Sequence, residues 1–241
     1  MYLYGQGVLR NYEASATWFL RAARVNNTDA QFSLGLMYEQ GRGLAQDTGE
    51  AMEWYLKAAR GGNADAQNYL GVLYSRGERV EQNYATSARW YREAAGQGLA
   101  DAQYHLALYY LEGLGVGENP GLAAQWLGKA AAQGHKEAQT TLGNMYLDGL
   151  GVAQDYLAAQ KLFIQAAAQG DIDAQFNLGR MYAQGLGVVK NADYARRWWQ
   201  RASVQGHAQA RDQLLELKKQ EAAARARYPL PYMNTRYAKY G

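Results

Sequence analysis

The chain carries a pattern that is clearest in residues 30–62, which read AQFSLGLMYEQGRGLAQDTGEAMEWYLKAARGG. The Ala-Gln pair that opens this stretch returns at positions 66, 102, 138 and 174, always 36 residues further on. Self-similarity at a fixed period of this length indicates a repeat architecture. A leucine column keeps the same step and consists of Leu34, Leu70, Leu106, Leu142, Leu178 and Leu214.

Each unit predicts two helices and no strand. Ala30 and Leu34 are four residues apart, which places them on one side of a helix with 3.6 residues per turn. Gly41 then indicates a helix end, because glycine adopts the left-handed conformation there without steric cost. Asp47 is a residue type that caps helix starts, so we expect a second helix from there to the stop at Gly62. The residues equivalent to Asp47 are Asn11, Asn83, Asn119, Asp155 and Asn191.

Neither helix is long or apolar enough to be stable alone in water. An aromatic pair such as Trp54 and Tyr55 would bury roughly 300–500 Å² of surface, and that burial requires a neighbouring unit. Small residues such as Gly35 on the first helix let backbones approach each other closely. The sequence therefore predicts an all-α solenoid of stacked helix pairs.

The motifs Leu-Gly-x-Met-Tyr, Gly-x-Gly-Val, an Asn or Asp, Ala-x-x-Trp-Tyr-x-x-Ala-Ala and a final Gly follow one another along the repeat. This combination resembles the Sel-one-like repeat family, which is related to the tetratricopeptide repeats. The chain departs from it at Leu162, where other units have Trp, at Arg79 in place of the second Gly, and at Ala107 in place of a helix Gly. The resemblance implies a right-handed α/α superhelix of antiparallel helix pairs that acts as an adaptor or scaffold, frequently in bacteria.

The repeat register predicts the domain organisation. We expect a partial repeat in residues 1–29, five complete repeats in 30–209, a capping helix in 210–227 and a basic tail containing Tyr and Pro in 228–241. Met1-Tyr2 aligns with Met37-Tyr38, so we expect that upstream sequence was removed. Solenoid ends need polar caps, and the repeat pattern fades after Leu217 into a charged helical run. The tail has no core pattern, so we expect it to be mobile or to lie along the surface.

Composition excludes several classes of protein. The net charge is +3, but residues 210–241 carry seven Lys or Arg against three Asp or Glu, so the body of the chain is neutral. A basic stripe typical of nucleic-acid binding is therefore not expected. The longest apolar run, Leu106–Leu111, is far shorter than the roughly 20 residues that cross a bilayer. The chain has no cysteine, and residues 1–20 lack a secretory signal. The localisation stays unknown, with bacterial periplasm and cytoplasm both open.

No set of residues predicts catalysis or cofactor binding. His135 and His207 occupy the same column two repeats apart, too far for one metal at roughly 8–10 Å per packed helix. His105, on a first helix, is either a groove residue or a solvated one. The repeated Gly-Leu-Gly-Val has neither a preceding strand nor a following Lys-Ser or Lys-Thr, so its glycines form turns and not a phosphate loop. We expect no enzyme activity, no metal and no cofactor.

The columns that vary between units point to a binding surface. On each first helix, the positions two, six, nine and ten residues after the phased Ala point away from the core side. In tetratricopeptide-like superhelices this side lines the concave surface, so the resemblance implies a groove there. The expected groove residues are Phe32, Leu36, Glu39, Asn68, Val72, Arg76, Tyr104, Leu108, Leu111, Glu112, Asn144, Leu147, Asp148, Phe176 and Arg180.

Three functions are compatible with this groove. We expect a non-enzymatic scaffold or adaptor that holds a peptide or protein segment, with apolar anchors for affinity and mixed charges for orientation. The alternatives are an inhibitor or immunity-type protein that blocks the active site of a toxin or enzyme, and more remotely a hydrolase. A structural alternative applies to Phe32, Tyr104 and Phe176, which could instead pack between adjacent first helices.

Overall fold

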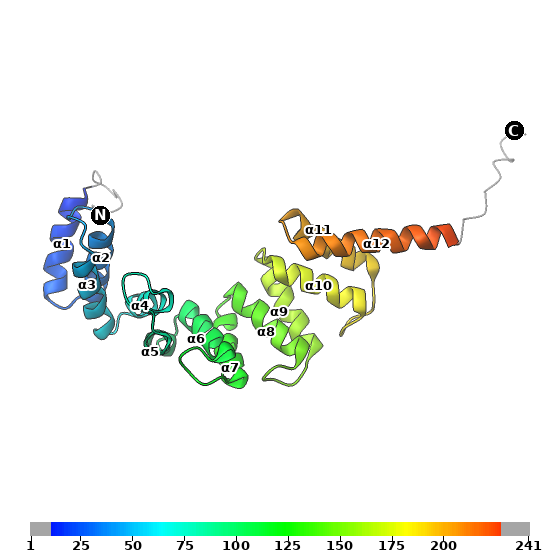
Figure 1. Cartoon of the computed structure of the whole chain (residues 1–241), viewed down its shortest axis with the longest axis horizontal. Helices are drawn as coiled ribbons and strands as arrows, with labels where there is room; N and C mark the ends of the chain where they lie inside the picture. Colours follow the sequence, from blue (N-terminus) through cyan, green and yellow to red (C-terminus); the bar gives the residue numbers. More distant parts are fainter. Residues whose placement is uncertain (1–10, 228–241) are drawn as a thin grey trace, which may run out of the picture. The chain divides into compact units, whose positions relative to one another are not determined.

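The computed structural model describes residues 11–227, with side chains up to residue 223. This part of the chain contains twelve α-helices and no strand (Figure 1). Each of the first eleven helices has 13 residues. The helices are α1 (Tyr12–Arg24), α2 (Thr28–Gln40), α3 (Thr48–Arg60), α4 (Ala64–Arg76), α5 (Tyr84–Gly96), α6 (Ala100–Glu112), α7 (Pro120–Ala132), α8 (Lys136–Asp148), α9 (Tyr156–Ala168), α10 (Ile172–Gln184), α11 (Ala192–Val204) and α12 (Ala208–Arg227).

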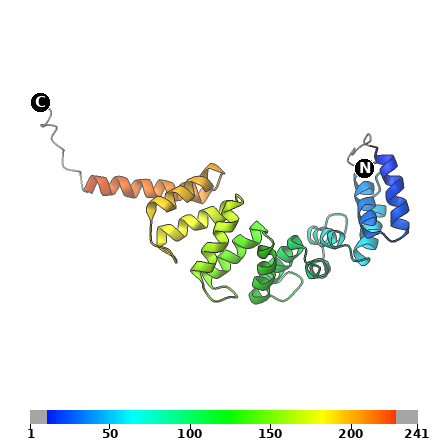
Figure 2. The same ribbon diagram turned by 180° about the vertical axis from the view of Figure 1, so that it is seen from behind.

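The helices form two compact units, one made of α1–α8 and one of α9–α12. In the first unit every helix packs against its neighbours in sequence: α2 against α1 and α3, α4 against α3 and α5, and so on to α7 and α8. In the second unit α10 packs between α9 and α11, and α12 packs on α11, which Figure 2 shows from behind. The helix packing within each unit is that of the predicted all-α solenoid of antiparallel helix pairs with a 36-residue repeat.

The predicted helix boundaries are confirmed by capping hydrogen bonds. Side chains in the predicted capping column accept hydrogen bonds from backbone amides in the first helical turn, which would otherwise have no partner. The residues that cap in this way are Asn11, Asp47, Asn83, Asn119 and Asn191. Gly41 ends α2 at φ 64°, in the left-handed region. Gly113 and Gly115, in one of the Gly-Leu-Gly-Val motifs, also have positive φ and so form a turn, as expected.

The core lies between successive repeats. One cluster combines Ala51 and Tyr55 of α3, Leu70 and Leu73 of α4 and Trp90 of α5, all at most 4% exposed. These three helices belong to two successive repeats. Because each repeat contributes only part of such a cluster, the apolar side of a helix pair is buried by the next pair along the chain.

A contact between an aromatic ring and a glycine sets the spacing in three of the helix pairs. A Cβ atom at Gly71 would lie 2.6 Å from the ring of Tyr91, so a side chain there would clash with the aromatic residue of α5. Tyr55 lies over Gly35 in the same way, and Trp199 over Gly179. In the third complete repeat the ring position holds Leu127 and the glycine position holds Ala107, both fully buried. In this repeat the side chain on the second helix, Leu127, is smaller than a ring, and the residue on the first helix, Ala107, is larger than a glycine.

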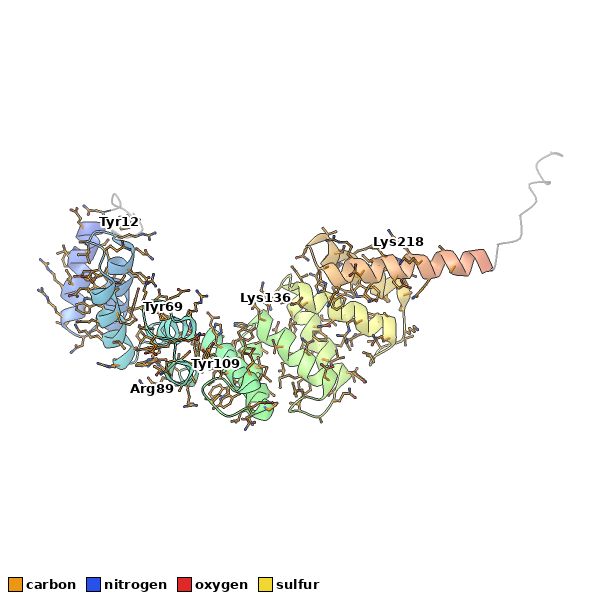
Figure 3. The ribbon with its side chains drawn as sticks, in the orientation of Figure 1. Tyr12, Tyr69, Arg89, Tyr109, Lys136 and Lys218 are labelled. Atoms are coloured by element: carbon orange, nitrogen blue, oxygen red, sulfur yellow. The ribbon has the colours of Figure 1, made fainter. Side chains whose placement is uncertain are left out.

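The last helix, α12, is longer because its stop signal is missing. Glu221 occupies the column in which Gly41 and Gly77 end earlier first helices, and α12 continues to Arg227, where the helical run was predicted to end. Lys218 projects from this helix (Figure 3). Its role as a cap stays a prediction, and the predicted tail in 228–241 lies outside the described residues. No helix in 11–227 combines the length and apolar character that crossing a bilayer requires.

Candidate protein-binding surfaces

The structure leaves the predicted groove residues accessible to different degrees. Arg76, Glu112 and Asp148 are exposed. Leu147 is only 3% exposed, so the prediction that it is open to a partner is wrong. It follows the buried Gly143 by four residues and therefore lies on the same side of α8. The partly buried members are Phe32, Leu36, Glu39, Asn68, Val72, Tyr104, Leu108, Leu111, Asn144, Phe176 and Arg180.

The three aromatic rings of the predicted groove pack toward the next first helix. The ring of Phe32 lies 6.0 Å from that of Tyr69 on α4, centroid to centroid. Tyr104 stacks on His135 at 4.7 Å, and Phe176 stacks on His207 at 4.4 Å. Packing between adjacent first helices, the structural alternative, therefore accounts for these contacts. That the exposed parts of the rings also bind a partner stays a prediction.

Glu39 is tied into a polar cluster in the first unit and is not a free groove charge. Its carboxylate accepts hydrogen bonds from the hydroxyls of Tyr69, at 2.7 and 2.9 Å, and Tyr55, at 3.1 Å. Nη1 of Arg79 pairs with Oε1 of Glu39 at 2.6 Å, and only 10% of the Glu39 side chain is exposed. Burial and the hydrogen bond to Glu39 raise the pKa of Tyr69, which is labelled in Figure 3. With three partners, Glu39 holds α2, α3 and α4 together.

His105 lies among aromatic rings and is not a solvated residue. Its imidazole stacks on the ring of Tyr91 at 5.0 Å and is tilted against that of Tyr104 at 5.6 Å. Burial lowers the pKa of His105 more than the nearby Asp101 carboxylate raises it, so burial favours the neutral imidazole. His105 therefore contributes packing to the first unit.

The other two histidines are helix caps. Nδ1 of His135 accepts from the amide of Ala138 at 3.2 Å, and Nδ1 of His207 accepts from the amide of Ala210 at 3.1 Å. They sit just before first helices, as predicted. Among the residues that the structure describes, no group of three or more His, Asp or Glu could hold a metal ion.

Two predicted groove residues meet at a hollow of about 650 Å³ in the second unit. Phe176 and Arg180 of α10 line one side, and Asp212 and Glu216 of α12 line the other. Trp199 of α11 is also part of the lining, and its Nε1 donates to the backbone oxygen of Phe176 at 3.2 Å. The lining also includes four glutamines and one further cation, namely Gln184, Gln209, Gln213, Gln220 and Lys190.

Sequence reasoning missed the role of the repeated glutamine. Gln67 is 4% exposed, and its Nε2 donates to the backbone oxygen of Ala59 at the end of the preceding second helix, over 2.9 Å. Its Oε1 accepts from Nε2 of Gln97, at the end of α5, over 2.7 Å. We call this pair of amides a rung. Two further rungs join Gln133 to Gln103 and Gln205 to Gln175, each over 2.9 Å. The constant 30-residue spacing of the two glutamines was the signal in the sequence.

Comparison with known proteins identifies the repeat. A family model of the Sel1 repeat matches six consecutive segments, residues 1–27, 28–63, 64–99, 100–135, 136–171 and 172–207. None of the curated proteins compared with the chain matches it.

Solved structures are similar over most of the chain. One is a protective antigen present in uropathogenic Escherichia coli strains that displays an SLR fold, with 35% identity and a TM-score of 0.86 over 92% of this chain and 48% of that one. This chain therefore spans about half the length of that protein. A Sel1 repeat protein from Oxalobacter formigenes has 35% identity and a TM-score of 0.72 over 85% of this chain and 84% of its own.

An immunity protein from Pseudomonas aeruginosa is more distant, with 18% identity and a TM-score of 0.45 over 84% of this chain and 76% of its own. This likeness is too low to carry a functional argument. The six matched repeats extend over residues 1–207, and two solved structures are 35% identical to the chain over the aligned residues. The chain belongs to the Sel1 repeat family.

Proposed function

We propose that the chain is a non-enzymatic interaction scaffold that binds an extended peptide or protein segment, and that the hollow between α10 and α12 is one of its binding sites. The observation that carries this proposal is the convergence of Phe176 and Arg180, two predicted groove residues, on a hollow of about 650 Å³. Ligand sites commonly have volumes of about 300–1,000 Å³. The Sel1 repeat fold is consistent with a role in protein interaction.

The chemistry of the lining suits a polypeptide. Phe176 and Leu217 offer apolar surface for a side chain, while a glutamine amide can both donate to a peptide oxygen and accept from a peptide nitrogen. Arg180 lies on the α10 side and Asp212 and Glu216 on the α12 side. Opposite charges on the two sides favour one orientation of a charged segment over the reverse.

A peptide-display selection tests the proposal. A random dodecapeptide library would be selected on the full chain, and the Kd of enriched peptides measured by fluorescence polarisation. We expect Arg180→Ala and Asp212→Ala to weaken binding by about tenfold each, as expected of contacts worth more than 1 kcal/mol. The matched control is Lys161→Ala, an exposed residue of α9 outside the hollow, which should leave Kd unchanged.

The outcomes also separate the alternative functions. Enriched peptides whose binding is insensitive to both hollow variants would refute the proposed site. If a natural partner is an enzyme or toxin whose activity falls in proportion to binding, the inhibitor alternative is favoured. Turnover of a panel of ester, amide and phosphate substrates by the purified chain would refute the non-enzymatic part of the proposal.

A further inference from the structure

The first junction of the solenoid lacks one half of its glutamine rung. Gln31 is 5% exposed and donates from Nε2 to the backbone oxygen of Ala23 at 3.2 Å, as Gln67 does in the next repeat. The residue that would complete the rung, 30 positions further on, is Gly61. Among the described residues, no side chain donates to Oε1 of Gln31. A carboxamide that is 5% exposed is therefore left with an acceptor that none of these side chains uses.

This acceptor belongs to a residue that lines a hollow of about 560 Å³ in the first unit. Ala23 of α1, Gln31 of α2, and Trp54 and Lys57 of α3 contribute to its walls. Nζ of Lys57 lies 4.3 Å from the centroid of the Trp54 ring, and Arg60 adds a second exposed cation to the lining. The site thus combines an acceptor that no described side chain uses with two cations, of which Lys57 also lies 3.7 Å from the carboxylate of Glu53.

These groups select a ligand by its chemistry. A ligand must donate a hydrogen bond to Oε1 of Gln31, which a carboxylate cannot do. An ammonium or guanidinium group could donate, but Lys57 and Arg60 repel it. A primary carboxamide satisfies both requirements, because its NH₂ donates while its oxygen accepts from a cation. In each of the three rungs named above, the group that bonds the equivalent oxygen is also a glutamine carboxamide.

We propose that this hollow, which we call the open rung, binds a glutamine or asparagine side chain of a partner protein. The partner's carboxamide would donate to Oε1 of Gln31, in the position that Gln97 holds relative to Gln67. The open rung lies in the first unit and is independent of the hollow at α10 and α12, so either site can be correct without the other.

Side-chain NMR provides a direct test. The probe is N-acetyl-glutamine N-methylamide, titrated into the ¹⁵N-labelled full chain while the side-chain NH₂ of Gln31 and the indole NH of Trp54 are followed. We expect saturable shifts with a Kd on the order of 1 mM, typical of a ligand of this size. The matched glutamate and leucine compounds should bind at least tenfold more weakly. Equal shifts with the leucine compound, or no saturable shift with the glutamine compound, would overturn the proposal.

A variant that completes the rung within the chain gives an independent control. Gly61→Gln supplies the missing carboxamide, and Thr28→Ala removes the methyl group that a Cβ at position 61 would contact. We expect the double variant to lose probe binding at least tenfold, and Thr28→Ala alone to retain it. Gln175, whose rung is complete, should show no shift in either protein. Undiminished binding to a folded double variant would also contradict the proposal. If the double variant does not fold, the comparison of the three probes on the wild-type chain still tests the proposal.

Discussion

Nε2 of Gln97 donates to Oε1 of Gln67 over 2.7 Å, and Nε2 of Gln67 donates in turn to the backbone oxygen of Ala59. One buried carboxamide on a first helix therefore links the ends of two successive second helices, α3 and α5. Burying an amide without partners costs free energy, whereas this one is bonded at both ends. The repeated glutamine thus fixes how one repeat sits on the next.

Loss of this amide should destabilise the solenoid. Gln67→Leu leaves the oxygen of Ala59 and the amide of Gln97 without partners, and we expect the free energy of unfolding to fall by about 1–3 kcal/mol. Gln97→Ala should cost less, about 0.5–1.5 kcal/mol, because Gln97 is exposed and water can replace its bond. Urea denaturation followed by circular dichroism measures both. Gln40→Leu, an exposed control on α2, should change little; an equal loss there would show that the effect is not due to the rung.

Substitutions at Gly71 and Tyr91 should partly compensate for each other in their effect on the free energy of unfolding. Gly71→Ala places a methyl group 2.6 Å from the ring, and we expect a loss of about 1–3 kcal/mol in unfolding free energy. Adding Tyr91→Leu recreates the Ala107–Leu127 combination, so the double variant should be more stable than the sum of the two single losses predicts. Gly128→Ala, in a helix interior with open space around it, should stabilise by about 0.5–1 kcal/mol. Strict additivity in the double-mutant cycle would refute the proposed size match.

Arg79 combines backbone strain with a useful ion pair. It has φ 66° where other repeats place glycine, and its guanidinium pairs with the largely buried Glu39. Arg79→Ala and Arg79→Gly both lose this pair, but only alanine keeps the strain of the left-handed conformation, roughly 1 kcal/mol. Thermal unfolding should therefore show the glycine variant to be the more stable of the two. Equal melting temperatures would mean that the loop relaxes and stores no strain.

The depressed pKa of His105 predicts a loss of stability in acid. Burial lowers its pKa below the unfolded value of 6.5, so its contribution is fully present above pH 6.5 and is lost as the pH falls through the folded pKa. Asp101 opposes this shift, while His135 and Arg76 reinforce it. We expect His105→Tyr, which copies Tyr69 in the same column, to lose less unfolding free energy than the wild type between pH 7.5 and 5. Identical losses in urea titrations at the two pH values would remove His105 as a cause.

The helices and their ends could be predicted from the sequence because the same types of capping and stop residues recur from repeat to repeat. Asn83 as a cap and Gly41 as a stop rest on local backbone preferences that do not depend on distant contacts. The accessible surface was harder to predict. Leu147 and Glu39 both lie four residues after a buried small residue, and whether that edge of the helix is covered depends on the neighbouring helices. The two hollows depend on shape and could not be read from one sequence.

An amide and side-chain chemical-shift map of the full chain bound to a selected peptide would show directly whether the hollow of the second unit is the binding site. We expect saturable shifts concentrated at Phe176, Arg180, Gln184 and Asp212, around this hollow. Shifts centred instead on Lys161 and other residues outside the hollow, or no saturable shifts at the hollow with a bound peptide, would contradict the proposal that this hollow binds the peptide.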